Sequence, residues 1–258
     1  MSPADNLRAR SLVAMTQAQI ARLPNKAQAV VVLTTGAIEQ HGRHLPVAVD
    51  ALMGQVWLER ALALLPADFP CYVTPPITIG RSVEHTGFPG TLTVSKETLR
   101  LQLLAIARQL HAWGFQRLAV LNTHGGNLAV LGYTLREMQA TFGLQAELLL
   151  PQWNFGLSAQ EETFGFHAGE LETGWMLAVA PALVDITAAT CEWPARLDQP
   201  GRLRPEASPA RVAWITQELS SSGVMGDATT ATKENGERWL KDGAGSVAAA
   251  IEAFYQLT

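Results

Sequence analysis

The sequence has little cysteine and no long apolar run, and each shortage excludes a class of protein. Only two cysteines occur, Cys71 and Cys191, and neither lies in a CxxC motif, so neither a disulfide framework nor a cysteine metal site is predicted. The longest apolar stretches, near Val30 and Met176, reach about half of the ~18 residues that a membrane span needs. The N-terminus also lacks the continuous apolar core of a signal peptide. We therefore expect a cytoplasmic protein that has no contact with membranes.

Charge is also scarce, and its two signs are nearly balanced. Nineteen basic residues oppose 23 acidic ones, the net charge is -4, and no run of like charge occurs. This distribution excludes the basic footprint that nucleic-acid binding requires. Hydrophobic residues make up 48% of the 258 residues, which is enough to bury a large core. The sequence contains no internal repeat, and we expect a single α/β domain over residues 1–258.

Apolar runs of strand length alternate with amphipathic helical stretches along the chain. The predicted strands are residues 29–34, 72–79, 117–122 and 146–150, and prolines make the second one irregular or place it at a sheet edge. The predicted helices are residues 51–65, 95–114, 127–143, 169–179, 208–221 and 245–257, while residues 181–209 are expected to form loops. Ser95 and Asn127 are predicted helix caps. Such alternation is typical of an α/β fold with a mostly parallel sheet.

Polar clusters directly follow two of the predicted strands. The segment GAIEQHGRHLPVAVD offers Glu39, His41, His44 and Asp50, and the segment NTHGGN offers His124. Since the carboxyl ends of parallel strands lie at one sheet edge, we expect these side chains to meet there. Histidines and carboxylates of this kind can hold two divalent ions, and Asp50 is the candidate for the carboxylate that bridges them. A hydrogen-bonded polar cluster without metal is the alternative at this point.

A third polar cluster, HAGELET, places His167, Glu170 and Glu172 at the start of a predicted helix. Here Glu172 is expected to face inward and Glu170 to face solvent. The glycines of THGGN would also suit a phosphate-binding loop. However, the lysine of a Walker motif and the three-glycine dinucleotide pattern are both absent, so nucleotide binding is the least favoured alternative.

Five motifs follow one another in a characteristic order. They are EQHGRHLPVAVD (39–50), VEHTGFPGT (83–91), NTHGGN (122–127), HAGELETGWML (167–177) and GVMGDATTATKENG (223–236). Together they closely resemble the creatininase family of amidohydrolases, over nearly the whole chain. The resemblance implies a three-layer α/β fold, a homohexamer, and a binuclear centre of zinc, manganese or iron ions. It also implies hydrolysis of an amide-like C–N bond in a small molecule, with a hydroxide that bridges the two ions as the nucleophile.

The resemblance also assigns roles to individual positions. Glu39, His41, Asp50 and His124 match metal ligands of the family, and Asp50 matches the bridging one. His167 matches the histidine proposed as an acid/base group, a role that suits protonation of a leaving nitrogen.

The sequence departs from the enzymes that open creatinine. Those enzymes carry an aromatic residue and a ligating Glu where Gly125 and Gly126 stand here, and a Trp where Thr163 stands. We expect Glu172 to replace the missing fifth ligand. The two-glycine form is instead similar to family members that deformylate pyrimidine precursors or cleave peptide-derived cofactors. We therefore favour an amidohydrolase of unassigned substrate. A creatinine amidohydrolase proper, and a non-catalytic scaffold that uses metal for stability, are the alternatives.

Further residues are weaker candidates. Glu84, His85 and Trp153 are predicted to contact substrate, although a structural role in the FPGT turn or in the core is the competing interpretation. For His44 two roles are equally expected: it either supports a metal ligand by a hydrogen bond or binds metal itself.

Three more residues are expected to have structural roles. Trp175 is expected to belong to the core rather than to an aromatic wall of the site. Lys233 and Glu234 are expected at a solvated helix start rather than against substrate or a neighbouring subunit.

Overall fold

The computed structural model describes residues 2–152, 154–194 and 212–257. Its main sheet has four parallel strands in the order β2-β1-β3-β4. They are β1 (Val30–Thr35), β2 (Cys71–Val73), β3 (Arg117–Asn122) and β4 (Gln145–Leu148). A strand forms at each of the four predicted positions, but of the predicted second strand, residues 72–79, only Tyr72 and Val73 belong to β2. The second is short and lies at the sheet edge, as Pro75 and Pro76 predict, because proline cannot donate to a strand ladder.

Helices precede, connect and follow the strands. The α-helices of the described chain are α1 (Pro3–Arg10), α2 (Gln17–Arg22), α3 (Val49–Leu64), α4 (Lys96–Ala112), α5 (Leu128–Phe142), α6 (Ala159–Phe164), α7 (Glu170–Val179), α8 (Thr216–Leu219) and α9 (Lys233–Gln256). Two 3₁₀ turns matter for the site, η2 (Val83–His85) and η3 (Gly125–Asn127). No helix within the described ranges has the length and apolar character needed to cross a bilayer.

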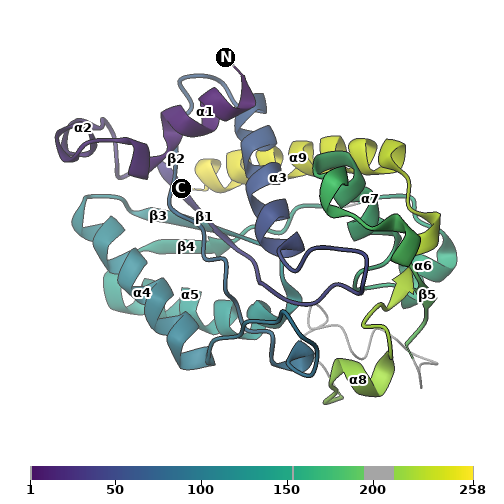
Figure 1. Cartoon of the computed structure of the whole chain (residues 1–258). Coiled ribbons are helices and arrows are strands. Elements are labelled where there is room, and N and C mark those ends of the chain that lie inside the picture. Colours follow the sequence, from purple (N-terminus) through teal and green to yellow (C-terminus); the bar gives the residue numbers. More distant parts are fainter. Residues whose placement is uncertain (1, 153, 195–211, 258) are drawn as a thin grey trace.

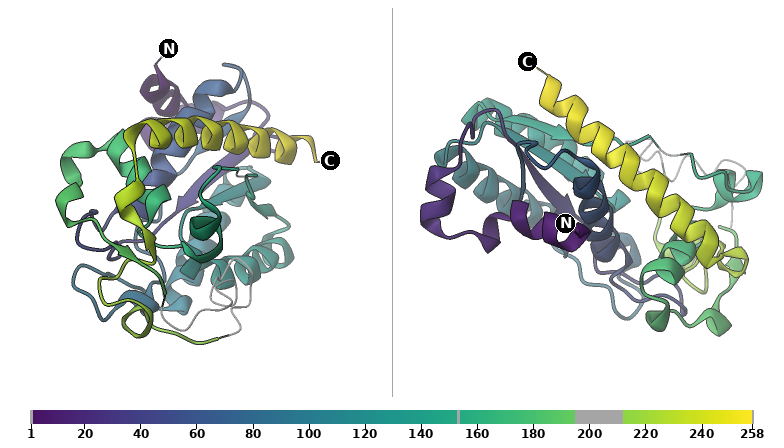
Figure 2. Two further views of the ribbon diagram at one scale, coloured as in Figure 1. Left: turned by 90° about the vertical axis from the view of Figure 1, so that its right-hand side faces the viewer. Right: turned by 90° about the horizontal axis from the view of Figure 1, so that it is seen from above.

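The sheet lies between two layers of helices (Figures 1 and 2). Alternate residues of β1 point to opposite faces, as in any strand. Val31 and Leu33 pack in one core cluster with residues of α4 and α5, while Val30 and Val32 pack in the other with residues of α3, α7 and α9. This arrangement is the three-layer α/β fold that the motifs predict, and the carboxyl ends of the strands emerge together at one edge.

The C-terminal helix is longer than predicted. It begins at Lys233 rather than at residue 245, and the side chain of Thr232 caps it by accepting the N–H of Asn235. The prediction was wrong because glycines in residues 236–245 disfavour an isolated helix. Packing overrides this preference. A Cβ atom at Gly236 would lie 1.8 Å from the Gly174 carbonyl oxygen, so the glycine allows α9 to approach α7 closely.

Three further predictions fail in part. Asn127 precedes α5 but does not cap it, because its side chain binds other loops. The predicted helix 208–221 is reduced, in its described part, to Thr216–Leu219, and residues 208–211 lie outside the described residues. Of the predicted loop 181–209, the described part also contains strand β5 (Cys191–Glu192), which pairs antiparallel with β6 (Gly226–Asp227).

Candidate metal centre

The polar cluster is built where β1 and β3 end side by side. Thr35 and Asn122 are opposite each other in the sheet, and the chain then turns into the two loops that carry the predicted ligands. Asn127 connects the loop after β1 to the loop that contains Arg81. Its side-chain amide donates to the Gly36 carbonyl at 3.1 Å, and its oxygen accepts the Arg81 N–H at 2.9 Å. The ligand-bearing loops are therefore fixed to one another by a buried side chain.

Asp50 lies at the centre of the cluster and contacts two histidines. Its Oδ2 is 3.1 Å from Nδ1 of His124, and its Oδ1 is 3.5 Å from Nε2 of His41. Glu39 approaches His124 from the other side, with Oε2 3.3 Å from Nδ1, and Glu172 approaches His41, with Oε2 3.7 Å from Nε2. The result is two groups that could each hold a metal ion and that share Asp50.

The unpaired atoms of the cluster fit a cation. Among the described residues, Glu39 Oε2, His41 Nε2 and Asp50 Oδ2 are buried and have no hydrogen-bond partner. Leaving such atoms unpaired costs about 1–3 kcal/mol each, and more for charged groups. Imidazole nitrogens and carboxylate oxygens are donors that zinc and related divalent ions accept. The five residues predicted as ligands are thus brought together with atoms that a metal would satisfy.

The two candidate histidine ligands are held in the tautomers that metal binding needs. Nδ1 of His41 lies 3.0 Å from the Glu39 carbonyl, and Nε2 of His124 lies 2.8 Å from the Arg81 carbonyl. A carbonyl oxygen only accepts, so these nitrogens carry the protons. When the ring is neutral, as metal binding requires, its other nitrogen carries the lone pair that an ion would accept. Metal-binding histidines in proteins show this pattern of support.

Charges in the cluster shift the pKa values of its members. Burial alone would lower the pKa of His41 and His124, but Glu172 beside the first and Glu39 beside the second raise both pKa values well above the usual range. Burial alone would raise the pKa of Asp50, yet its two histidine neighbours lower it. Protons on the histidines therefore balance the carboxylates when no cation is bound.

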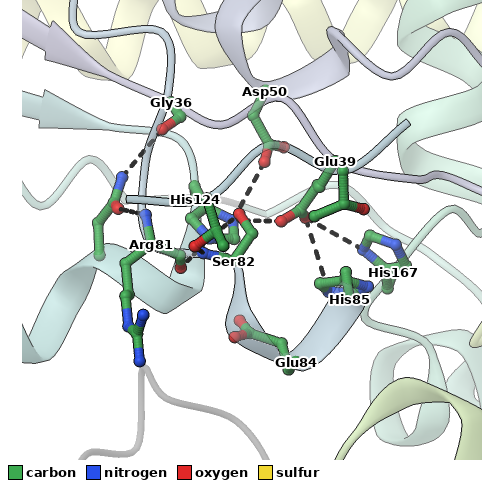
Figure 3. Close-up of polar contacts among 12 residues, drawn as sticks. Gly36, Glu39, Asp50, Arg81, Ser82, Glu84, His85, His124 and His167 are labelled. Carbon is green, nitrogen blue, oxygen red and sulfur yellow. Dashed lines mark hydrogen bonds and ion pairs between the residues drawn. The ribbon is translucent and has the colours of Figure 1, made fainter. Parts of the chain in front are cut away.

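His167 joins the cluster from the loop before α7. Its main chain pairs with that of Met225, and its Nδ1 lies 3.7 Å from Oε1 of Glu39 (Figure 3). The ring packs against those of His41 and His85, with centroids 4.4 and 4.2 Å away. Burial, with the nearby His85, lowers the pKa of His167 to about 3. His167 also forms a third potential metal group with Glu39 and His41.

The segment Glu84–His85 lies against the same cluster. His85 is buried, and its Nε2 lies 3.7 Å from Oε1 of Glu39. Glu84 is half-buried, and burial raises the pKa of its carboxyl. A Cβ atom at Gly126 would lie 2.2 Å from the Arg81 carbonyl oxygen and 2.7 Å from Oε1 of Glu84. The space in front of position 126 is therefore filled, and no side chain fits there without movement of this loop.

The structure separates some predicted residues from the cluster. His44 belongs to none of the three metal groups, and its Nε2 lies 2.8 Å from the Thr173 hydroxyl. Burial, with the nearby His41, lowers the pKa of His44 to about 4. Glu170 belongs to none of these groups either, and Trp153 lies outside the described residues.

The structural roles expected for Trp175 and Lys233 agree with the structure. Trp175 is buried in the core, where its ring is edge-on to that of Trp57 at 4.6 Å. Lys233 is exposed at the first position of α9 and pairs with Glu237 at 3.6 Å, as expected for a solvated helix start.

Sequence reasoning missed the residues that support the histidines. Gln40 is buried against His85 and His167, and the Ser82 hydroxyl lies 3.2 Å from Nε2 of His124. Thr216 contacts Nδ1 of His85 at 2.9 Å from a distant segment. The position of Gln40 between two predicted ligands was a usable signal, whereas nothing local in the sequence marks Ser82 or Thr216.

A cavity of about 960 Å³ lies away from the cluster. It is lined by the segments that lead into β1 and β2, including Gln28 and Pro70, and by Arg10. It therefore belongs to the amino ends of the strands, and none of the predicted site residues borders it.

Comparison with known proteins agrees with the motifs. A family model described as creatininase, creatinine amidohydrolase, matches residues 13–251. The mycofactocin precursor peptide peptidase of Mycolicibacterium smegmatis is 34% identical over 214 residues, which are 81% of this chain and 78% of that protein. The creatinine amidohydrolase of Pseudomonas putida is 30% identical over 233 residues, which are 82% of this chain and 84% of that protein.

A solved structure has the same fold. A mutant creatininase of the Zn-Zn type matches with a TM-score of 0.74 and 26% identity, over 96% of this chain and 98% of that chain. The family model covers most of the chain, and both relatives named above are hydrolases aligned over about four fifths of it. We conclude that the chain belongs to the creatininase family of hydrolases.

Proposed function

We propose that this protein is a metal-dependent amidohydrolase that cleaves a C–N bond other than an ordinary peptide bond, in a cyclic amide, a formamide or an amide derived from a peptide. One observation carries the proposal. Asp50 is shared by two groups of histidine and carboxylate donors, in a family whose named members include a peptide peptidase and a creatinine amidohydrolase. This arrangement suits two adjacent ions joined by one carboxylate.

We assign Glu39, Asp50 and His124 to one ion, and His41, Asp50 and Glu172 to the other. The distances and the unpaired buried atoms support this assignment. Glu172 serves as the fifth ligand because position 126 has no room for a side chain. When bound, two ions of zinc, manganese or iron would polarise the substrate carbonyl and lower the pKa of the attacking water.

We assign proton transfer to His167. Its lowered pKa leaves the ring neutral near pH 7, so the ring first accepts a proton and then gives it to the leaving nitrogen. The rings of His41 and His85 pack against the imidazole at interplanar angles of 36° and 32° and hold it in place beside Glu39. An acid/base residue must sit within reach of the reacting atoms, and the position of His167 beside the proposed ligands satisfies this need.

Glu84 and His85 are proposed to border the substrate. Glu84 is half-buried and burial raises the pKa of its carboxyl, so a donor group of the substrate would stabilise its charged form. Trp153 keeps its proposed role on the evidence of the sequence alone. A substrate derived from a peptide is favoured over creatinine, because the 34% identical relative is a peptide peptidase and because Gly125 and Gly126 depart from the creatinine enzymes.

The test is turnover by protein loaded separately with zinc, manganese or iron. Formamides, lactams including creatinine, and short peptides with blocked or modified ends are incubated with each form, and products are identified by mass spectrometry. We expect hydrolysis of at least one class, loss of activity with a chelator, and recovery when metal returns. Firm metal binding without turnover of any class would contradict the proposal and support the non-catalytic scaffold.

We further propose a cytoplasmic homohexamer. The two described cysteines are free thiols, which agrees with a reducing compartment. Light scattering after size-exclusion chromatography tests the assembly, since six chains differ clearly in mass from two or four.

A further inference from the structure

The side chain of Gln40 is fixed in one orientation inside the cluster. It is only 4% exposed. Its Oε1 accepts the Gly42 N–H at 2.9 Å, and its Nε2 donates to the Gly223 carbonyl at 3.1 Å. Because an N–H only donates and a carbonyl only accepts, these two contacts decide which end of the amide is nitrogen. Gly223 has a φ of +85° and would place a Cβ atom 2.1 Å from Oε1, so this position is built for glycine.

The main-chain carbonyl of Gln40 determines the tautomer of His167. This oxygen lies 2.8 Å from Nε2 of His167, and the Gln40 side-chain nitrogen lies 3.0 Å from the same atom. The carbonyl oxygen only accepts, so a hydrogen bond between it and the ring nitrogen needs a proton on Nε2. If Nε2 carried the lone pair instead, it could accept from the Gln40 amide but would face the carbonyl oxygen at 2.8 Å without a proton between them. In neutral His167 the proton is therefore on Nε2, and the lone pair is on Nδ1. That nitrogen is the one that faces Oε1 of Glu39, at 3.7 Å (Figure 3).

The side chain of Gln40 determines the tautomer of His85. Its Nε2 lies 2.9 Å from Nδ1 of His85, and the Thr216 hydroxyl lies 2.9 Å from the same nitrogen. Suppose that Nδ1 of His85 carried the proton. The second N–H of the Gln40 side chain would then have no acceptor, because His85 and His167 would both present an N–H to the Gln40 nitrogen. Such an unpaired donor is the costlier choice. If Nδ1 instead accepts from Gln40, the Thr216 hydroxyl donates to the Glu84 carbonyl at 3.0 Å, and every group is satisfied.

We infer that Gln40 is a positioning residue that holds both histidines as Nε2–H tautomers. Glu39 Oε1 then faces an N–H of His85 and a lone pair of His167, each from 3.7 Å. His167 thus presents an empty proton-acceptor site to the reacting atoms, while His85 presents a donor. The kinetic consequence rests on the proposed function, but the tautomers themselves do not.

The tautomers can be measured directly in the full-length protein. Long-range ¹H–¹⁵N spectra of protein labelled at its six histidines distinguish protonated from unprotonated ring nitrogens, in the metal-free and the zinc-loaded states. We expect proton-bearing Nε2 in both His85 and His167. A wild-type spectrum with the proton on Nδ1 of either ring would overturn the inference, whatever the enzyme does with substrates.

Three substitutions separate the contributions. In Gln40→Glu the new carboxylate only accepts hydrogen bonds, so we expect Nδ1 of His85 to gain a proton. In Gln40→Met the side chain neither donates nor accepts strongly, so we expect a mixture of His85 tautomers. Thr216→Val is the matched control, because it removes the other partner of Nδ1 and is expected to leave the His85 tautomer unchanged. The inference fails if Thr216→Val changes the tautomer and the Gln40 variants do not.

Kinetics provide the second readout. With metal content unchanged, both Gln40 variants are expected to lower kcat about 10- to 100-fold with little change in KM, and to shift the pH profile of kcat. A loss of the same size in Thr216→Val, or an unshifted pH profile in Gln40→Glu, would point to general structural damage instead. A protein with the expected tautomers but no activity would reject the proposed function and leave the inference standing.

Discussion

Oδ2 of Asp50 lies 3.1 Å from Nδ1 of His124, although the two residues follow different strands of the sheet, β1 and β3. The parallel pairing of these strands places both loops at one edge, and Asn127 then fixes the loops to each other. The other oxygen of Asp50 faces His41. The two halves of the proposed centre therefore meet at one buried carboxylate.

Metal content distinguishes the shared carboxylate from the others. We expect Asp50→Ala to lose both ions and all measurable turnover, because both groups depend on it, and Glu172→Gln to lose one ion. Elemental analysis of purified protein gives the ion count, and circular dichroism checks the fold. Glu170→Gln, two residues away on α7, is the matched control and is expected to keep both ions. Two ions and full turnover in Asp50→Ala would show that the bridge is wrongly assigned.

A side chain at position 126 should disturb the site. Gly126→Ala places a Cβ atom 2.2 Å from the Arg81 carbonyl oxygen, and overpacking of this kind costs about 1–3 kcal/mol of unfolding free energy. Gly132→Ala is the control, since a Cβ atom there meets nothing within 4 Å and alanine favours α5 by about 1 kcal/mol. Chemical denaturation measures both changes. Equal stability of the two variants would mean that the loops at position 126 are not closely packed.

Metal binding should strengthen as the pH rises. The pKa values of His41 and His124 are raised, so both rings carry protons near pH 7 and must lose them to the ion. Each released proton changes the affinity for zinc by about tenfold per pH unit. Two released protons therefore give up to about 100-fold per pH unit. Calorimetric titration with zinc at several pH values, in buffers of different ionisation enthalpy, measures this. An affinity independent of pH between 6 and 8 would contradict it.

The same shifts predict how the metal-free protein responds to alkali. A histidine whose folded pKa is raised above its unfolded value of 6.5 contributes its full stability below that pH and loses it as the pH rises through the folded pKa. His44, His85 and His167, with lowered pKa values, act in the opposite sense but only below pH 6.5. Above pH 6.5 we therefore expect the Tm of the metal-free protein to fall with rising pH. Zinc should remove this dependence.

His167→Asn separates chemistry from metal binding. If the ring transfers protons, kcat should fall about 10²- to 10⁴-fold while two ions remain bound. His111→Asn, on α4 and outside the cluster, is expected to change neither quantity. Loss of an ion in the His167 variant would instead support the third group, in which His167 binds metal with Glu39 and His41.

Much of this architecture was predictable from local sequence signals. The continuous apolar runs of β1 and β3 and the Ser95 cap of α4 appear in the structure as predicted, because each depends on neighbours along the chain. The start of α9 was not predictable. The contact between Gly236 and Gly174 joins distant helices, and no local preference reports such a contact.

The sequence by itself determined the order of the motifs, and with it the family and the candidate ligands, because residue types and spacing are local properties. The motifs also made Asp50 the candidate bridge and Glu172 the candidate fifth ligand. Only the tertiary structure gives the distances, with Asp50 common to both groups, Glu172 at 3.7 Å from His41, and no free space for a side chain at Gly126. It also decided the tautomers around Gln40. These outcomes depend on which atoms of distant loops meet and in what direction, and burial makes each unsatisfied donor or acceptor costly enough to select one arrangement.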